Sequence, residues 1–166
     1  MPSPRPPWGA PRPGRTPPIG GKKGTKRHLL VDATGVPLSL VVSGANVNDH
    51  LRLPDLLRRP AVRRPRPRPG APQHLCADKG YDYPATRTVI AAYGYVAHIP
   101  ARGAAAAAPR RHPRKRARRW VVEACHAWLN RFRKLLVRFE KKDGNYIALL
   151  EFACAIIAWR HAGVLG

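Results

Sequence analysis

The sequence predicts an α/β fold. Residues 73–77 form a short apolar run that ends in a polar turn, residues 83–93 have a helical pattern, and residues 95–100 alternate like a second strand. A strand, a helix and a strand in this order indicate a parallel pair joined by a right-handed crossover. Residues 22–46 contain two strand-like runs around a glycine-containing turn, which is typical of a β-hairpin.

Three further segments have helical periodicity. Residues 50–59 have a short amphipathic pattern. Between residues 116 and 139, apolar residues that recur every three or four positions predict one long amphipathic helix; they are Val121, Ala124, Trp128, Phe132, Leu135 and Phe139. Residues 146–161 predict a last helix, whose apolar run is shorter than the roughly 20 residues of a membrane span. We therefore expect this helix to be buried in the core.

The remaining segments predict irregular structure. Residues 1–20 are rich in Pro, Gly and Arg, so we expect a disordered, polyproline-like tail in front of one domain at 21–166. Residues 60–72 predict a proline-rich loop or linker, and residues 102–119 predict a mobile basic loop.

The charge of the chain favours polyanionic partners. It has 31 Lys and Arg against nine Asp and Glu, a net charge of +22, so nucleic acid ranks before an anionic membrane and small neutral substrates are disfavoured. Basic runs at 22–27, 58–68 and 102–119 are candidate DNA contacts; the alternative interpretation is solvated charge without a specific partner. No secretory signal is apparent, and we expect a cytoplasmic protein that does not enter the membrane.

Two of the nine acids are candidates for chemistry. Asp78 follows a buried strand, at the edge where α/β sheets place their ligands. Glu123 lies on a second, polar face of the predicted 116–139 helix, whose other members are Arg119, His126, Asn130 and Arg133. For Glu123 the alternative is a surface ion pair with Arg119.

The other acids favour structural roles. Asp32 lies in a D-A-T-G turn, where its side chain can bond to the nearby backbone. Asp49 is expected to cap the helix that follows it. Glu151 interrupts an apolar helix, so it either reaches solvent or pairs with a cation such as Arg160.

Four segments of the chain resemble the sequence motifs of a known family. They read, in order, K-K-G-T-K-R-H-L-L-V-D-A-T-G-V-P-L, S-G-A-N-V-N-D, A-D-K-G-Y-D and R-W-V-V-E-A-C-H-A-W-L-N-R-F-R-K-L. Together they make residues 21–161 resemble the DDE-type transposases of bacterial insertion sequences, which have a ribonuclease H-like catalytic domain. The resemblance implies that Asp78 is the second acid and Glu123 the third acid of the catalytic triad. It also implies two Mg²⁺ (or Mn²⁺) ions for DNA cleavage and strand transfer at insertion-sequence ends.

The resemblance also implies partners. Double-stranded DNA of the transposon ends and the target is expected to contact basic and polar residues, namely Lys22, Lys23, Lys26, Arg27, Lys79, Arg119, Asn130 and Arg133. A homo-oligomer is expected when the protein is active, and an upstream-frame product or a full-length transposase is a further expected partner. The expected cellular location of the protein is the bacterial cytoplasm, in association with the nucleoid.

One part of the family pattern is absent. In the family the first acid lies on a strand upstream of the segment that residues 22–35 resemble, and residues 1–20 occupy that place here. We therefore expect a partial catalytic domain, with a ribonuclease H-like fold incomplete at its N-terminal strand and inactive alone. The absent strand would lie between the hairpin and the strand before Asp78. The alternative function is a noncatalytic basic DNA-binding protein or an inhibitor of full-length transposase.

Overall fold

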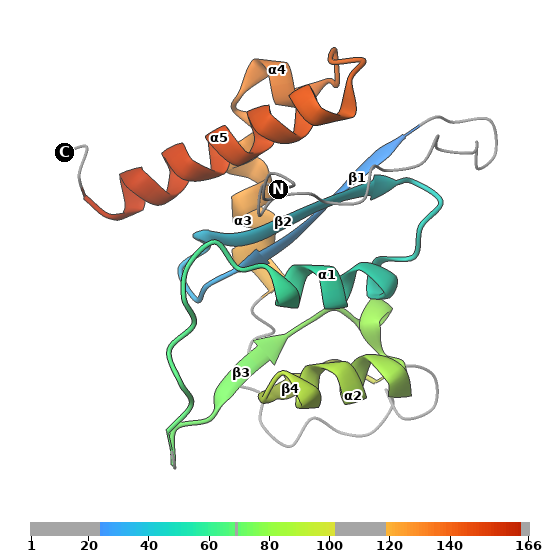
Figure 1. Ribbon diagram of the computed structural model, residues 1–166, viewed down its shortest axis with the longest axis vertical. Helices are drawn as coiled ribbons and strands as arrows, with labels where there is room; N and C mark the ends of the chain where they lie inside the picture. Colours follow the sequence, from blue (N-terminus) through green and yellow to red (C-terminus); the bar gives the residue numbers. More distant parts are fainter. Residues whose placement is uncertain (1–23, 69, 102–118, 164–166) are drawn as a thin grey trace, which may run out of the picture.

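The computed structural model of the chain describes residues 24–68, 70–101 and 119–163. Within these residues the chain forms two two-stranded sheets with helices packed around them (Figure 1), which confirms the predicted α/β class. The predicted tail at 1–20 lies outside the described residues. The predicted basic loop at 102–119 also lies outside them, apart from Arg119, whose backbone begins a helix.

The first sheet is the predicted hairpin. Strand β1 (Thr25–Val31) pairs antiparallel with strand β2 (Pro37–Gly44). In the turn, Asp32 Oδ1 accepts hydrogen bonds from Thr34 N at 2.8 Å and from Val36 N at 3.0 Å. Burial raises the pKa of the Asp32 carboxyl, but these hydrogen bonds outweigh it and hold the pKa below its ordinary value. The predicted turn role of Asp32 is confirmed.

Gly35 closes this turn in a conformation that disfavours a side chain. Its φ is +97°, and a Cβ would lie 3.1 Å from the Trp128 ring and 3.4 Å from Val121 O. We expect Gly35→Ala to lower the free energy of unfolding by about 1–3 kcal/mol, as measured by urea denaturation. Gly144→Ala is the control, because nothing lies within 4 Å of the added methyl group and alanine favours the helix. Equal losses in the two variants would contradict the strain at Gly35.

A short helical segment and a long extended segment follow the hairpin. The 3₁₀ helix η1 (Asp49–Arg52) leads into helix α1 (Leu53–Arg58), at the place of the predicted short helix. The described residues between α1 and the next strand form no helix and only an isolated bridge between Arg68 and Ala71. The predicted loop at 60–72 is therefore confirmed for the residues that the structure describes.

One arginine fixes the extended segment to the second sheet. Arg64 Nη2 donates a hydrogen bond to Gly94 O at 3.1 Å, and the Arg64 guanidinium carbon lies 3.6 Å from the ring centroid of Tyr95. This is a cation–π contact. Arg66 and Arg68, in contrast, are exposed. Arg64 thus has a structural role, whereas the two arginines after it face solvent.

The second sheet is the predicted β-α-β unit. Strand β3 (Gln73–Cys76) pairs in parallel with strand β4 (Tyr95–His98), and helix α2 (Pro84–Ala92) connects them. Gly94 has a φ of +71° just after α2, as expected for a glycine that ends a helix.

The predicted long helix at 116–139 is wrong in its extent. The structure has helix α3 (Arg119–Asn130) and a separate helix α4 (Arg133–Leu136). Phe132 separates them with an extended backbone, φ −79° and ψ 103°. The physical reason is packing, because Phe132 and Leu135 both contact the cluster of buried residues around the last helix.

The last helix, α5 (Asp143–His161), is buried on one face only. Its buried residues are Tyr146, Leu150, Ala153 and Ile157. Phe152 and Trp159 are 65% and 50% exposed, so the prediction of a fully buried helix is wrong. Glu151 is exposed, in agreement with the first of its two predicted alternatives. No helix in the described part of the chain, α5 included, is long and apolar enough to cross a membrane.

Two hydrophobic clusters cover the two faces of the hairpin. Leu29 packs against the cluster formed by α3, α4 and α5, whereas Leu30 packs against the cluster formed by α1, α2 and β3. Consecutive strand residues point to opposite faces, so the hairpin lies between two layers, as Figure 1 shows. It therefore links the α3–α5 half of the molecule to the half that carries Asp78.

Candidate active site

Asp78 lies at the carboxyl end of a strand, as the sequence predicts. Ala77 N donates to His98 O at 3.1 Å, which extends the β3–β4 pairing by one residue. The chain then turns into the 3₁₀ helix η2 (Lys79–Tyr81), where Tyr81 N donates to Asp78 O at 2.9 Å. Asp78 is half-buried. Its position is the one where parallel strands of α/β proteins present ligand-binding side chains.

Tyr81 lies close to Asp78 and to a second carboxylate, Asp49. Burial, and then the charges of Asp49 and Asp78, raise the pKa of Tyr81 to about 12. Charges shift a pKa in this way when they lie within several ångströms, and η1 and η2 are in contact. The two carboxylates therefore border the same region, and sequence reasoning missed both Asp49 and Tyr81 as its members.

Asp49 is held by a lysine of β1. Lys26 Nζ lies 3.0 Å from Asp49 Oδ1 and donates a hydrogen bond to Val47 O at 3.0 Å. The N-cap of η1 is Asn48, without a side-chain cap hydrogen bond. The prediction that Asp49 caps this helix is wrong, because Lys26 engages the carboxylate. The polar residues Asn46, Asn48 and Asp49, shortly after the end of β2, were the available signal for this site.

Two histidines, His28 of β1 and His126 of α3, lie near charged residues of β1. His28 Nε2 is 2.7 Å from Ser43 Oγ, and burial lowers the pKa of His28 more than the charge of Asp49 raises it. Burial, and then the charge of Arg27, lower the pKa of His126. Both shifts favour the neutral form of the imidazole. Helix α3 packs against β1.

Glu123 lies on α3, one turn before His126, and its side chain is exposed. The last residue of α3 contacts β1: Arg27 Nη2, on β1, donates a hydrogen bond to Asn130 Oδ1 at 2.7 Å. Two of the expected DNA contacts thus bind each other. The alternative ion pair between Glu123 and Arg119 involves a side chain that lies outside the described residues.

Comparison with known proteins decides the family. The family model described as "Transposase DDE domain" matches residues 3–158. The chain belongs to this family. A protein from Burkholderia cepacia whose name describes it as a transposase for insertion sequence element IS402 is 36% identical over 155 residues, which cover 92% of this chain and 71% of that protein. No solved structure matches the chain.

Because the chain belongs to this family, the function of this transposase domain is DNA transposition, and its partner is DNA. Transposases of the DDE type use divalent metal ions. The family match begins at residue 3, inside the segment expected to be a tail. Because the structure does not describe that segment, its assignment as a tail stays a prediction.

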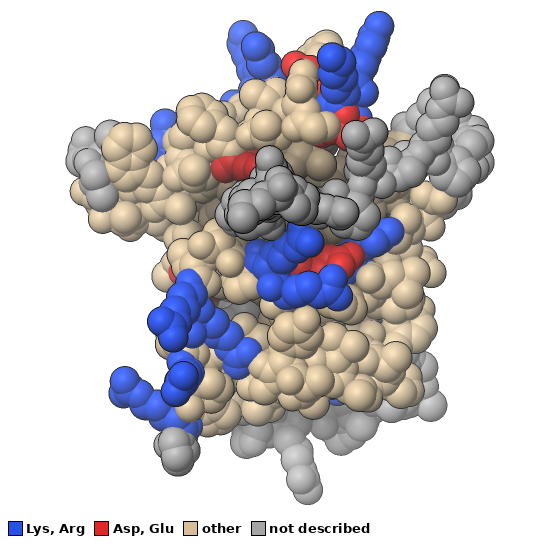
Figure 2. Space-filling model, in the orientation of Figure 1, with Lys and Arg blue, Asp and Glu red and all other residues tan. Residues whose placement is uncertain are grey.

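Two of the remaining expected DNA contacts of the transposase domain, Lys79 and Arg133, lie on different elements, η2 and α4. Lys79 and Arg133 are exposed, whereas Lys22 and Lys23 lie outside the described residues. Figure 2 shows Lys and Arg side chains over the extended segment after α1 and, at the other end of the molecule, over α4 and the start of α5. Positive charge is therefore spread over this face and is not confined to one groove.

The donor set of the site suits a divalent cation only in part. Asp49, Asp78 and Glu123 offer carboxylate oxygens, which Mg²⁺ and Mn²⁺ prefer, and none of the three is fully buried. Among the described residues, however, no three His, Cys, Asp or Glu side chains lie close enough together to hold a metal ion. The described part of the transposase domain thus supplies suitable ligands without a complete set.

Proposed function

We propose that this chain carries part of a metal-dependent DDE catalytic site on a ribonuclease H-like fold, with Asp78 and Glu123 as metal ligands. The observation that carries the proposal is the position of Asp78 at the carboxyl end of β3, half-buried and beside Tyr81. Glu123 is exposed on α3, the helix that packs on β1. A strand end and a flanking helix can direct two carboxylates toward one place.

The reaction would be in-line displacement at a DNA phosphodiester. Two bound Mg²⁺ or Mn²⁺ ions would supply stabilisation of the attacking and leaving oxygens. The carboxylates of Asp78 and Glu123 would hold the ions, and the nucleophile would be water or a DNA 3′-hydroxyl, so no side chain has to form a covalent bond. Lys79, next to Asp78, would hold a DNA phosphate by charge.

The first acid of the triad is proposed to come from outside the described residues, in a longer polypeptide or in a partner. Two observations support an incomplete site. No three suitable ligands converge among the described residues, and β1–β2 and β3–β4 form two separate sheets. A strand between β1 and β3 would join them into one sheet and could bring a further carboxylate between Asp78 and α3. We therefore propose that the described part is inactive alone.

Metal binding tests the proposal without requiring catalysis. The chain is titrated with Mn²⁺, and free Mn²⁺ is measured by electron paramagnetic resonance. We expect Asp78→Asn and Glu123→Gln each to weaken Mn²⁺ binding by about tenfold or more, because even loss of an outer partner of a metal ligand costs about 10–100-fold. Glu140→Gln, which removes an acid from the region between α4 and α5, is the matched control and should change nothing. Unchanged binding in both site variants would overturn the assignment.

The second candidate function is a noncatalytic DNA-binding protein or an inhibitor of full-length transposase. The lack of a complete ligand set among the described residues favours it, and so does the net charge of +22. This function predicts that Asp78→Asn leaves both Mn²⁺ binding and DNA affinity unchanged. The same titration therefore separates the two functions.

A further inference from the structure

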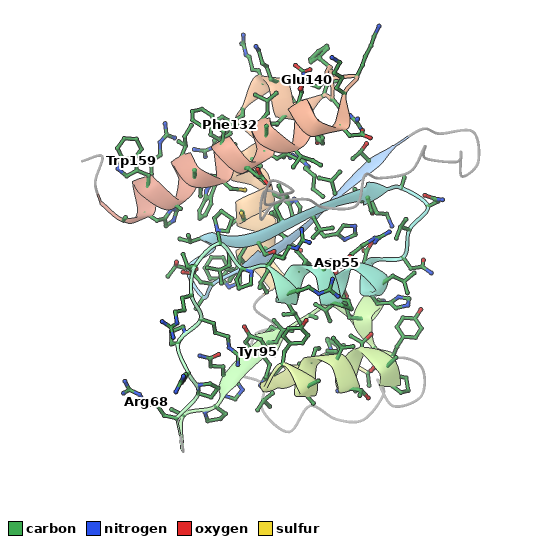
Figure 3. The ribbon with its side chains drawn as sticks, viewed as in Figure 1. Asp55, Arg68, Tyr95, Phe132, Glu140 and Trp159 are labelled. Carbon is green, nitrogen blue, oxygen red and sulfur yellow. The ribbon has the colours of Figure 1, made fainter. Side chains whose placement is uncertain are left out.

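The second sheet has one covered face and one exposed face. Leu75 of β3 is buried, and Tyr95 (Figure 3) and Ala97 of β4 pack against the same cluster of α1, α2 and β3 residues. Successive side chains of a strand point to opposite faces, so the residues between these three lie on the other face. All four of them are exposed; they are His74, Cys76, Val96 and His98.

The two histidines of the exposed face lie against each other. Strands β3 and β4 are parallel, and their register places His74 opposite Val96 and Cys76 opposite His98, so the histidines are diagonal neighbours. His74 Nδ1 lies 2.7 Å from His98 Nε2, and the ring centroids are 4.8 Å apart. In a hydrogen bond between two imidazoles, one nitrogen donates a proton and the other accepts it with its lone pair. Two potential metal-binding nitrogens therefore meet at one place on the sheet.

We propose that His74 and His98 together bind a divalent transition-metal ion of the kind that imidazole prefers, such as Zn²⁺ or Ni²⁺. Imidazole nitrogens suit these ions, whereas Mg²⁺ and Mn²⁺ prefer the oxygens of carboxylates and water. In the described part of the chain, no third His, Cys, Asp or Glu side chain joins the pair in a group that could hold a metal ion. The protein therefore supplies two ligands, and water supplies the others.

The two nitrogens are close to the separation that a shared metal ion requires. Two metal–nitrogen bonds of about 2.0–2.1 Å that meet at a right angle place the nitrogens about 2.9 Å apart, and the observed distance is 2.7 Å. Both side chains are exposed, so each ring can turn toward the ion without a change in the core. The proton between the rings moves to the other nitrogen of its own ring, and two neutral imidazoles then bind without releasing a proton.

A metal ion at this pair would connect β3 and β4 next to Asp78. His98 O accepts the hydrogen bond from Ala77 N at 3.1 Å, and Asp78 is the next residue. Because the ion binds the folded sheet, it should stabilise the fold by mass action. The ligands differ from Asp78 and Glu123, so failure of the proposed catalytic site leaves this inference untouched.

Calorimetric titration of the chain with NiCl₂, in the absence of a polyhistidine tag, tests the site. Ni²⁺ is the probe because it binds imidazole and does not oxidise thiols such as Cys76. We expect His74→Ala and His98→Ala each to weaken Ni²⁺ binding by about tenfold or more, since even loss of an outer partner of a metal ligand costs about 10–100-fold. His161→Ala is the matched control, because it removes an imidazole of α5, and it should leave Ni²⁺ binding unchanged.

Urea denaturation supplies a second readout. Ni²⁺ should raise the denaturation midpoint of the unmodified chain and of His161→Ala, and should leave the midpoint of a His74→Ala/His98→Ala double variant unchanged. An excess of Mg²⁺ should not displace Ni²⁺, because Mg²⁺ prefers oxygen ligands. Ni²⁺ binding that is unchanged in both single variants, weakened in only one of them, or abolished by Mg²⁺ would refute the two-histidine site.

Discussion

Raising the salt concentration from about 50 to about 200 mM is expected to weaken DNA binding by this chain about 10³-fold or more. Each phosphate contact releases condensed counterions from DNA, so six or more contacts make the affinity fall steeply with salt. The net charge of +22 supplies enough cations for that number. The measurement is fluorescence anisotropy of a labelled duplex titrated with protein at several NaCl concentrations.

Neighbouring arginines of the extended segment provide the controls. Arg66 and Arg68 are exposed, so Arg66→Ala and Arg68→Ala should each reduce the slope of log affinity against log salt by about one if they contact phosphates. Arg64 is bound to Gly94 and stacked on Tyr95. Arg64→Ala should therefore lower stability and leave the slope unchanged. A flat salt response of the unmodified chain would rule out both the transposase site and the noncatalytic binder.

Local patterns in the sequence predict most of the fold. The hairpin depends on a turn whose residues bond within five positions of each other, from Asp32 to Val36. The β-α-β unit depends on short periodic runs that end at a glycine. Such signals are complete within a few residues, so they can be recognised before any tertiary contact is known. The same holds for Asp78, whose strand and turn are adjacent in the chain.

The parts that sequence analysis missed depend on contacts between distant residues. The pairing of Lys26 with Asp49 spans 23 residues, so nothing near Asp49 indicates it. The end of α3 depends on the packing of Phe132 against α5, and the uninterrupted periodicity of 121–139 hid that break. The exposure of Phe152 was missed because α5 is apolar on all sides, and composition alone then predicts burial.

Removal of a core side chain from α5 is expected to have the largest effect on stability. Leu150 is fully buried, with 0% exposure, among Leu129, Tyr146 and Ala153. Leu150→Ala loses the transfer free energy of the side chain and leaves a cavity, which together cost about 2–5 kcal/mol. We expect the midpoint of urea denaturation to fall accordingly, with little change in the slope of the transition.

Phe152→Ala is the matched comparison, two residues further along the same helix. Phe152 is 65% exposed, so its truncation should change the free energy of unfolding by less than about 1 kcal/mol. Equal destabilisation by the two substitutions would mean that Phe152 packs into the core in solution, and the burial of α5 on one face only would then be wrong.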